Sequence, residues 1–173
     1  VQLTTGIDSK LLKFIPTIGD HRFGIPLSLN KQLKNVINNF DILHQHGIWL
    51  PFSKFTTSLS KYKKTIISPH GLLEQESLKF SSFKKQIASF LYESKNLEKC
   101  SCLVACSIQE AEGFRKYGLK QPIVIIPNGI EKEWLNTVKD TRCSFKTKFN
   151  IPFNSKVLLF LSRIHPWKGI DLV

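Results

Sequence analysis

The feature that most constrains the fold of this chain is its alternation of short apolar runs with longer amphipathic stretches. Short apolar runs are typical of buried strands, and period-3.6 patterns between them are typical of helices. Apolar strands that alternate with helices favour a parallel sheet covered on both faces. The sequence therefore predicts an α/β fold, with strands at Val1–Thr5, Asp41–His44, Thr65–Ser68, Cys102–Cys106, Ile123–Ile126 and Val157–Leu161.

Two amphipathic stretches predict helices with one apolar face. The first spans Ser28–Asn39, and the second and longest spans Ser81–Glu98. The longer helix carries an apolar stripe, which normally faces the core. The stripe is formed by Phe83, Ile87, Phe90 and Leu91 and is continued by Leu97.

A third helix has a recognisable start and end. Ser107 is a typical N-cap residue, and Glu110 completes a capping box three residues later. Gly118 is a typical C-cap residue, so the helix is expected to end near Tyr117. For Glu110 we expect a capping role and nothing more.

The polar segment Glu131–Asn150 predicts a domain boundary. It separates an N-terminal domain, residues 1–140, from the start of a second domain, residues 141–173. The chain contains no Met and ends inside an apparent helix start, so we expect it to be a piece of a longer polypeptide. A turn is predicted at Pro127-Asn128-Gly129.

Composition narrows the class of protein. Hydrophobic residues make up 42% and charged residues 22% of the 173 residues, which excludes a disordered or collagen-like chain. The net charge of +12 suits nucleic acid, an anionic membrane or phosphate-bearing substrates, although a solvated charged face is the commoner explanation. The four cysteines lack zinc-site spacing and favour a reduced, cytoplasmic location. No apolar run is long enough to span a membrane.

Polar, glycine-flanked residues follow the carboxyl ends of successive predicted strands. In open parallel sheets, ligands bind outside these strand ends. The recurrence of the pattern therefore predicts a ligand site at one edge of the sheet. The residues are His44, His46, Gly47 and Trp49; Pro69, His70 and Gly71; Ser107; Asn128 and Gly129; and Arg163, His165 and Lys168.

Four segments in this order resemble the group 1, or family 4, glycosyltransferases that build bacterial surface polysaccharides. The segments are His44-Gln45-His46-Gly47-Ile48-Trp49, Ser68-Pro69-His70-Gly71-Leu72-Leu73, Pro127-Asn128-Gly129-Ile130-Glu131 and the run from Leu161 to Asp171. The last, with its Ser-Arg-Ile-His-Pro-Trp-Lys-Gly element, is the most specific. The family's glycine-rich first loop would precede Val1 and its paired-glutamate motif would follow Val173, so this chain alone is expected to be inactive.

The resemblance implies a GT-B fold of two Rossmann-like domains. The first of these domains would be incomplete here, and only the start of the second would be present. It implies a retaining glycosyltransferase that moves a sugar from a nucleotide-sugar donor to a saccharide or lipid-linked acceptor. Such an enzyme is expected to need no metal or other cofactor. Its expected location is the cytoplasm, with peripheral binding at the inner face of the membrane as a further expectation.

Within this framework, the residues suggest distinct roles. Arg163 and Lys168 flank a turn at a helix start and are suited, with the backbone of Gly169, to bind the donor diphosphate. By resemblance, His70 would face the transferred sugar, where it would orient a hydroxyl or stabilise charge. A second interpretation makes Arg163 and Lys168 a surface pair and His70 a histidine that caps the core.

The remaining candidates are assigned to the acceptor side of the cleft. His46, Gly47, Trp49 and Gly71 are expected to line the acceptor pocket, and Asn128 and Gly129 to lie near the interdomain hinge. Core packing is almost as good an explanation for Trp49, and a simple turn for Asn128-Gly129. A metal site at His44, His46 and His70 is the weaker alternative, so no metal ligand is assigned.

Two questions stay open at this stage. The basic amphipathic Ser81–Lys99 helix suits either an anionic membrane surface or ordinary packing on the sheet with a solvated face. The activity has two alternatives: an epimerase-like nucleotide-sugar enzyme of the same fold, which would need acid/base carboxylates in the cleft, and a nucleic-acid-binding module. We find no nucleic-acid recognition element in the sequence and therefore expect no nucleic-acid partner.

Overall fold

The computed structural model of the chain describes residues 12–19, 24–132, 142–165 and 168–172. The chain divides into two units, residues 1–127 and 128–173, each of which is described by itself. The predicted strand Val1–Thr5 lies outside the described residues. The domain boundary placed between residues 140 and 141 stays a prediction.

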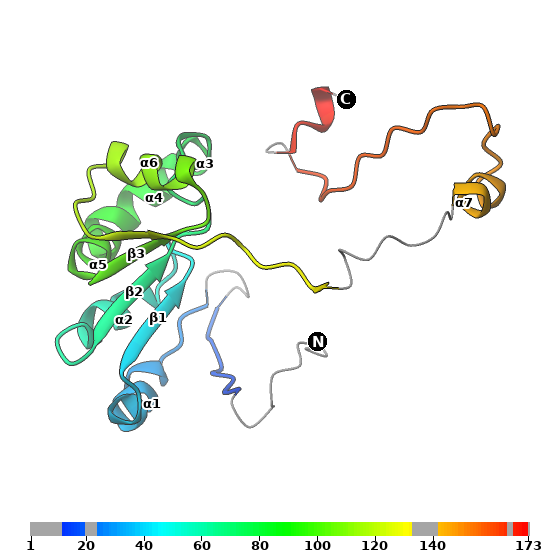
Figure 1. Cartoon of the computed structure of the whole chain (residues 1–173). Coiled ribbons are helices and arrows are strands. Elements are labelled where there is room, and N and C mark those ends of the chain that lie inside the picture. The colour runs from blue at the N-terminus through cyan, green and yellow to red at the C-terminus, as the bar shows by residue number, and fades with distance from the viewer. Residues whose placement is uncertain (1–11, 20–23, 133–141, 166–167, 173) are drawn as a thin grey trace. The chain divides into compact units, whose positions relative to one another are not determined.

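The first unit is built on a four-stranded parallel sheet with the strand order β1-β2-β3-β4 (Figure 1). The register pairs His46 with Ser68 across β1 and β2, Ile66 with Cys102 across β2 and β3, and Ala105 with Ile125 across β3 and β4. The α/β class and the parallel sheet predicted from the apolar runs are thus confirmed. The strands are β1 (Ile42–His46), β2 (Lys64–Ser68), β3 (Cys102–Ala105) and β4 (Ile123–Ile125).

Helices connect the strands, as the alternating pattern predicts. The predicted Ser28–Asn39 helix forms as α1 followed by a short 3-10 turn. The longest predicted helix forms as one continuous run, with a π-helical segment between two α-helical parts. The helical segments of this unit are α1 (Leu29–Val36), η2 (Ile37–Asn39), α2 (Ser53–Leu59), α3 (Gln75–Lys79), α4 (Ser82–Ala88), η3 (Ser89–Glu93), α5 (Ser94–Lys99) and α6 (Ile108–Lys116).

Among the described residues, burial differs between the two faces of the sheet, although the sequence predicts a sheet covered on both. Inward residues such as Thr65, Ile67 and Leu103 are fully buried, whereas their neighbours along the strands, such as Ile66 and Val104, are only partly buried. Because each strand lies beside its successor, right-handed crossovers place the connecting helices on the same face. The core therefore lies on the helix-covered face, where Ile67, Leu103 and Ala105 meet Leu97 and Phe114.

The apolar stripe of the long helix does not face the core, which is the clearest correction to the sequence-based prediction. Phe83 is 72% and Phe90 is 90% exposed, whereas Ala88, Glu93 and Leu97 are buried. The π-helical turn η3 changes the angular phase of the residues that follow it, so Leu97, which is buried, does not continue the stripe. The exposed stripe consists of Phe83, Ile87, Phe90 and Leu91.

Helix α6 begins and ends where its capping residues predict. The Ser107 hydroxyl accepts a hydrogen bond from the backbone N–H of Glu110 at 3.1 Å. Gly118, with φ of 97°, follows the C-cap residue Tyr117. The side chain of Glu110, however, does not complete a capping box, because it reaches other backbone groups that are described below.

The second unit contains helix α7 (Arg142–Lys148) and the 3-10 turn η6 (Ile170–Leu172). The predicted buried strand Val157–Leu161 is wrong for this unit: the segment forms no strand, and Leu158 is 87% exposed. A strand requires a neighbour, and no described residue pairs with this segment. The predicted Pro127-Asn128-Gly129 turn is also absent, because these residues form neither a hydrogen-bonded turn nor a bend.

Candidate functional site

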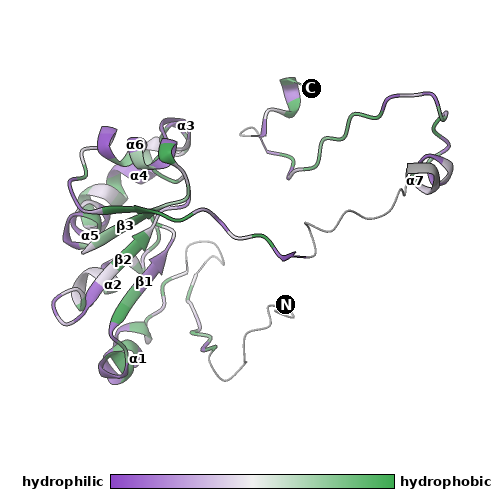
Figure 2. Cartoon of the chain, in the orientation of Figure 1, coloured by the Kyte–Doolittle hydropathy of each residue, from purple (hydrophilic) through white to green (hydrophobic). Residues whose placement is uncertain are grey.

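The carboxyl ends of β1, β2 and β3 bring the predicted strand-end residues of the first unit together. β1 ends at His46, β2 at Ser68 and β3 at Ala105, and the parallel register aligns these ends at one edge of the sheet. The carboxyl end of β1 is hydrophilic, whereas the interior strands are mostly hydrophobic (Figure 2). The edge thus combines an apolar sheet with polar side chains at its rim, as ligand sites in parallel sheets do.

A histidine pair forms the centre of this edge. His46 Nδ1 lies 2.9 Å from His70 Nε2, so one ring donates a hydrogen bond to the other. The two rings are nearly parallel, with centroids 5.2 Å apart. His70 Nδ1 lies 3.5 Å from the sulfur of Cys106, the residue that directly follows β3. These two contacts link the carboxyl ends of β1, β2 and β3 through side chains that carry exchangeable protons.

His44 adjoins the pair on the same face of β1, as its spacing of two from His46 predicts. The His44 and His46 ring centroids are 4.1 Å apart, and His44 Nε2 lies 2.8 Å from the hydroxyl of the buried Ser68. Partial desolvation of the ring lowers the pKa of His44, and the nearby His46 and His70 lower it further. His44 therefore favours the neutral form more strongly than a free histidine does.

The backbone of both turns is held in the left-handed region. Gly47 and Trp49 follow β1 with φ values of 78° and 70°, and His70 and Gly71 follow β2 with 54° and 76°. Positive φ is uncommon for any residue other than glycine, and less so for histidine than for tryptophan, and such backbone persists only where surrounding contacts determine it. Strain at two adjacent strand ends marks this edge as a candidate site on grounds independent of the motifs.

Trp49 is held by three hydrogen bonds. Its backbone N–H donates to Glu93 Oε2 at 2.8 Å, and its indole N–H donates to the carbonyl of Leu72 at 3.1 Å. The hydroxyl of Tyr92 donates to the Trp49 carbonyl at 3.2 Å. The ring also packs partly against the core, and Lys85 Nζ lies 5.9 Å from its centroid. Both roles left open for Trp49, site and core, are therefore compatible with its position.

Glu93 is a functional-site neighbour that the sequence analysis missed. Its side chain is fully buried beneath the turn that follows β1. Besides Trp49, its carboxyl group binds the side-chain amide of Asn96 at 2.8 Å and the hydroxyl of Ser53. Burial raises the pKa of Glu93, while these hydrogen bonds lower it in part. The available signal was an acidic residue within the inward-facing positions of a helix that covers the sheet.

Glu110 also does more than the capping role expected of it. Its side chain is 3% exposed, and its two carboxylate oxygens accept from two different turns. Oε1 lies 2.6 Å from the backbone nitrogen of Gly71, and Oε2 lies 2.6 Å from that of Cys106. Partial burial raises the pKa of the Cys106 thiol, and the charge of Glu110 and a hydrogen bond to its carboxylate raise this pKa further.

This arrangement suits proton transfer and charge stabilisation better than nucleophilic catalysis. One imidazole donates a hydrogen bond to the other, and imidazole nitrogens can accept or give a proton during a reaction. The raised pKa of Cys106 makes the reactive thiolate scarce. Among the described residues, no group of three or more His, Cys, Asp or Glu side chains is arranged to hold a metal ion.

The other predicted site residues lie in the second unit. Arg163 and Lys168 are exposed, and Gly169 has φ of 62° directly before the η6 turn. Lys168 donates its backbone N–H to the carbonyl of His165 at 2.9 Å. Asn128 and Gly129 lie in this unit also. Because each unit is described by itself, their roles remain predictions.

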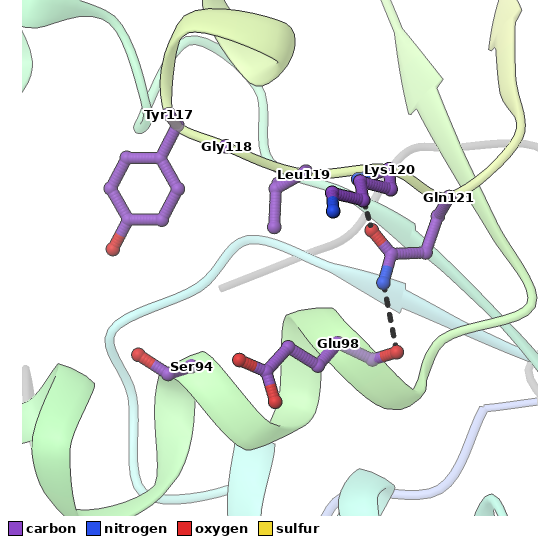
Figure 3. Close-up of a pocket in the computed structure, with 7 residues that line it drawn as sticks. All are labelled: Ser94, Glu98, Tyr117, Gly118, Leu119, Lys120 and Gln121. Atoms are coloured by element: carbon purple, nitrogen blue, oxygen red, sulfur yellow. Dashed lines mark hydrogen bonds between the residues drawn. The ribbon is translucent and has the colours of Figure 1, made fainter.

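A polar pocket occurs elsewhere on the first unit. It has a volume of about 460 Å³ and is lined by Ser94, Glu98, Tyr117, Gly118, Leu119, Lys120 and Gln121 (Figure 3). The amide of Gln121 donates to the carbonyl of Glu98 at 2.8 Å across it. These residues precede β3 and β4, so the pocket lies at the amino ends of the strands. It is therefore separate from the histidine pair at the carboxyl ends.

Comparison with known proteins supplies the family. The family model described as Glycosyltransferase Family 4 matches residues 7–134, which include the histidine pair, both strained turns and all four strands. The chain belongs to glycosyltransferase family 4. The resemblance inferred from the four motifs is thereby confirmed, and glycosyltransferase activity is supported. The segment with Arg163, Lys168 and Gly169 lies beyond the matched residues.

Two other comparisons gave no match, and the described helices include no membrane span. Neither the curated proteins nor the solved structures gave a match. Within the described ranges, no helix has the length and apolar character needed to cross a membrane.

Proposed function

We propose that this family 4 glycosyltransferase transfers a sugar from a nucleotide-sugar donor to a saccharide or lipid-linked acceptor, with retention of configuration. The pathway we propose is surface polysaccharide synthesis. The observation that carries the proposal is the His46–His70 pair, held on strained turns at the carboxyl edge of a parallel sheet. His70 orients a hydroxyl of the transferred sugar or stabilises the charge that develops during transfer. His46 sets the tautomer of His70.

We place the acceptor pocket at the same carboxyl edge of the sheet. His46, Gly47, Trp49 and Gly71 line the acceptor pocket in this proposal, and Asn128 and Gly129 lie on the cleft near the hinge. An aromatic ring held by three hydrogen bonds, as Trp49 is, offers a rigid apolar face for a sugar ring. The reaction is proposed to need no metal, because the donor diphosphate is neutralised by side chains.

Arg163, Lys168 and the backbone of Gly169 bind the donor diphosphate in this proposal. Both side chains are exposed, and the positive φ of Gly169 directs backbone around the start of a helical turn. Charged groups of this kind bind phosphate most strongly where several donors converge. Retention would be tested by NMR analysis of the product anomer, and an inverted linkage would contradict it.

A thermal-shift panel tests the donor proposal on the protein at its natural length. UDP, GDP, ADP and their sugar conjugates are compared on the wild type, on Arg163→Ala/Lys168→Ala, and on Lys156→Ala as an exposed-lysine control. A ligand at about 100 times its Kd stabilises the fold by about 2.7 kcal/mol. We expect one nucleotide to raise Tm in the wild type and control only. Equal shifts in the double variant would contradict the diphosphate site.

The epimerase-like alternative requires acid/base carboxylates that face the ligand. The two buried carboxylates near the candidate site, Glu93 and Glu110, both accept from backbone N–H groups and are covered. This use of their oxygens favours transfer over epimerisation. Epimerised donor recovered without acceptor would contradict this preference.

We further propose peripheral binding to an anionic membrane through the exposed stripe of Phe83, Ile87, Phe90 and Leu91. These side chains are between 45% and 90% exposed. Exposed lysines adjoin the stripe at Lys84 and Lys95, and apolar groups flanked by lysines bind anionic interfaces. A lipid-linked acceptor would be reached from such a position.

Vesicle flotation separates this proposal from an ordinary solvated helix face. Phe83→Ser/Phe90→Ser is compared with Phe40→Ser, which changes a 56% exposed phenylalanine outside the stripe. We expect the wild type and control to float with phosphatidylglycerol vesicles at low salt and the double variant to remain unbound. Equal flotation of all three proteins, or none with the wild type, would contradict membrane binding.

A further inference from the structure

Two strained turns carry His70 and Trp49, and each turn is held by one buried carboxyl group. Glu110 accepts from the backbone of Gly71, next to His70, and Glu93 accepts from the backbone of Trp49. Of the acidic side chains that the structure describes, these are the two that are buried. A buried carboxyl group is costly unless hydrogen bonds satisfy it, so its partners are informative.

Glu110 is the more informative of the two carboxyl groups because it binds the ends of two separate strands. Its Oε1 receives the N–H of Gly71 after β2, and its Oε2 receives the N–H of Cys106 after β3. The imidazole of His70, from the turn after β2, reaches the turn after β3, with Nδ1 3.5 Å from the Cys106 sulfur. One side chain on α6 thus fixes the spacing of the turn that carries His70 and the turn that its ring reaches.

We propose that Glu110 is a positioning residue, which holds His70 in its left-handed turn and thereby maintains the His46–His70 hydrogen bond needed for transfer. Glu110 does not touch the substrate in this proposal. The proposal rests on the proposed function for its catalytic consequence, whereas its structural part concerns the histidine pair alone.

The chemistry of the carboxylate offers a sharp test. Both of its oxygens accept from N–H groups, whereas the amide of glutamine has one accepting oxygen and one donating NH2. Glu110→Gln therefore places two donors against each other at either Gly71 or Cys106, with almost no change in side-chain volume. Glu112→Gln, on an exposed position of the same helix, is the matched control.

The first readout is NMR of ¹⁵N-labelled histidine rings in the wild type and both variants. We expect Glu110→Gln to change the Nδ1 signal of His46 and the Nε2 signal of His70, while Glu112→Gln leaves them unchanged. Unchanged ring signals in a folded Glu110→Gln protein would overturn the proposal. Loss of the fold in Glu110→Gln would overturn it as well, because Glu110 would then stabilise the sheet as a whole.

The second readout is turnover of the nucleotide-sugar that the thermal-shift panel identifies. Glu110→Gln is expected to lower kcat at least tenfold with a smaller change in the donor KM, because in the proposed function the donor diphosphate is bound by Arg163 and Lys168 and not at the histidine pair. An unchanged kcat would contradict a positioning role. If the wild type turned over no nucleotide-sugar, the proposed function would fail, and the histidine signals would still decide whether Glu110 holds the pair.

Discussion

At the scale of single residues, the ionisation of Glu93 makes the stability of the fold depend on pH. Its carboxyl group is fully buried and is bound by neutral donors from Trp49, Asn96 and Ser53. Asn96 in turn donates to Gln45 at 3.2 Å, so the network extends under β1. Because burial dominates, the pKa of Glu93 in the fold lies above its ordinary value of 4.5.

The raised pKa predicts the direction of a pH effect on stability. As pH rises above 4.5, the unfolded chain loses the Glu93 proton first, so the free energy of unfolding falls until pH passes the folded-state pKa. Glu93→Gln should weaken this decline, and the exposed Glu98→Gln should retain it. Urea unfolding between pH 4.5 and 8 measures the difference. The same pH dependence in Glu93→Gln and the wild type would show that Glu93 does not cause it.

His44 provides a second residue-scale prediction, of opposite sign. Its pKa is lowered by burial and by His46 and His70, so an NMR titration should place it below the ordinary 6.5. Stability linked to His44 is therefore present above pH 6.5 and is lost as pH falls below it. His46→Gln should raise the pKa of His44 only in part, since burial is the larger cause. No rise at all would exclude the charge contribution of His46.

At the scale of elements, burial along the helices was harder to predict than the helices themselves. The Ser107 N-cap and Gly118 each specify a local conformation, so the ends of α6 followed from sequence. The inward face of the long helix did not, because its apolar stripe is exposed and its buried positions include Glu93 and Asn96. Glu93 and Glu110 were missed as site neighbours because their partners lie 44 and 39 residues away in sequence.

Two phenylalanines on different helices test which faces are buried. Phe114 on α6 is fully buried in the core, whereas Phe90 on η3 is 90% exposed. Phe114→Ala should lower the free energy of unfolding by about 3–5 kcal/mol through cavity formation. Phe90→Ala should change it by less than about 0.5 kcal/mol, as surface substitutions do. Chemical denaturation measures both, and a comparable loss in the two variants would contradict the assigned faces.

At the scale of the whole molecule, the structure brings the predicted strand-end residues of the first unit to one edge of the sheet. Polar residues after the strands predicted one edge, and the parallel register brings His46, His70 and Cys106 together there. The hydrogen bonds among them could not be predicted, since they join three separate strand ends and involve His70, whose backbone is left-handed. The Val157–Leu161 segment shows the opposite case, in which a clear strand pattern has no described neighbour with which to pair.

The most direct test of the central claim is release of UDP, GDP or ADP from their sugar conjugates, with a simple saccharide as acceptor, by the protein at its natural length. His70→Asn is the informative variant, because asparagine tolerates the left-handed backbone of this position. Lys120→Ala, at the pocket on the opposite edge, is the control. We expect release by the wild type and the control, and a rate at least about 100-fold lower in His70→Asn at an unchanged Tm. Equal rates in all three proteins would contradict a role for His70 and for this edge of the sheet.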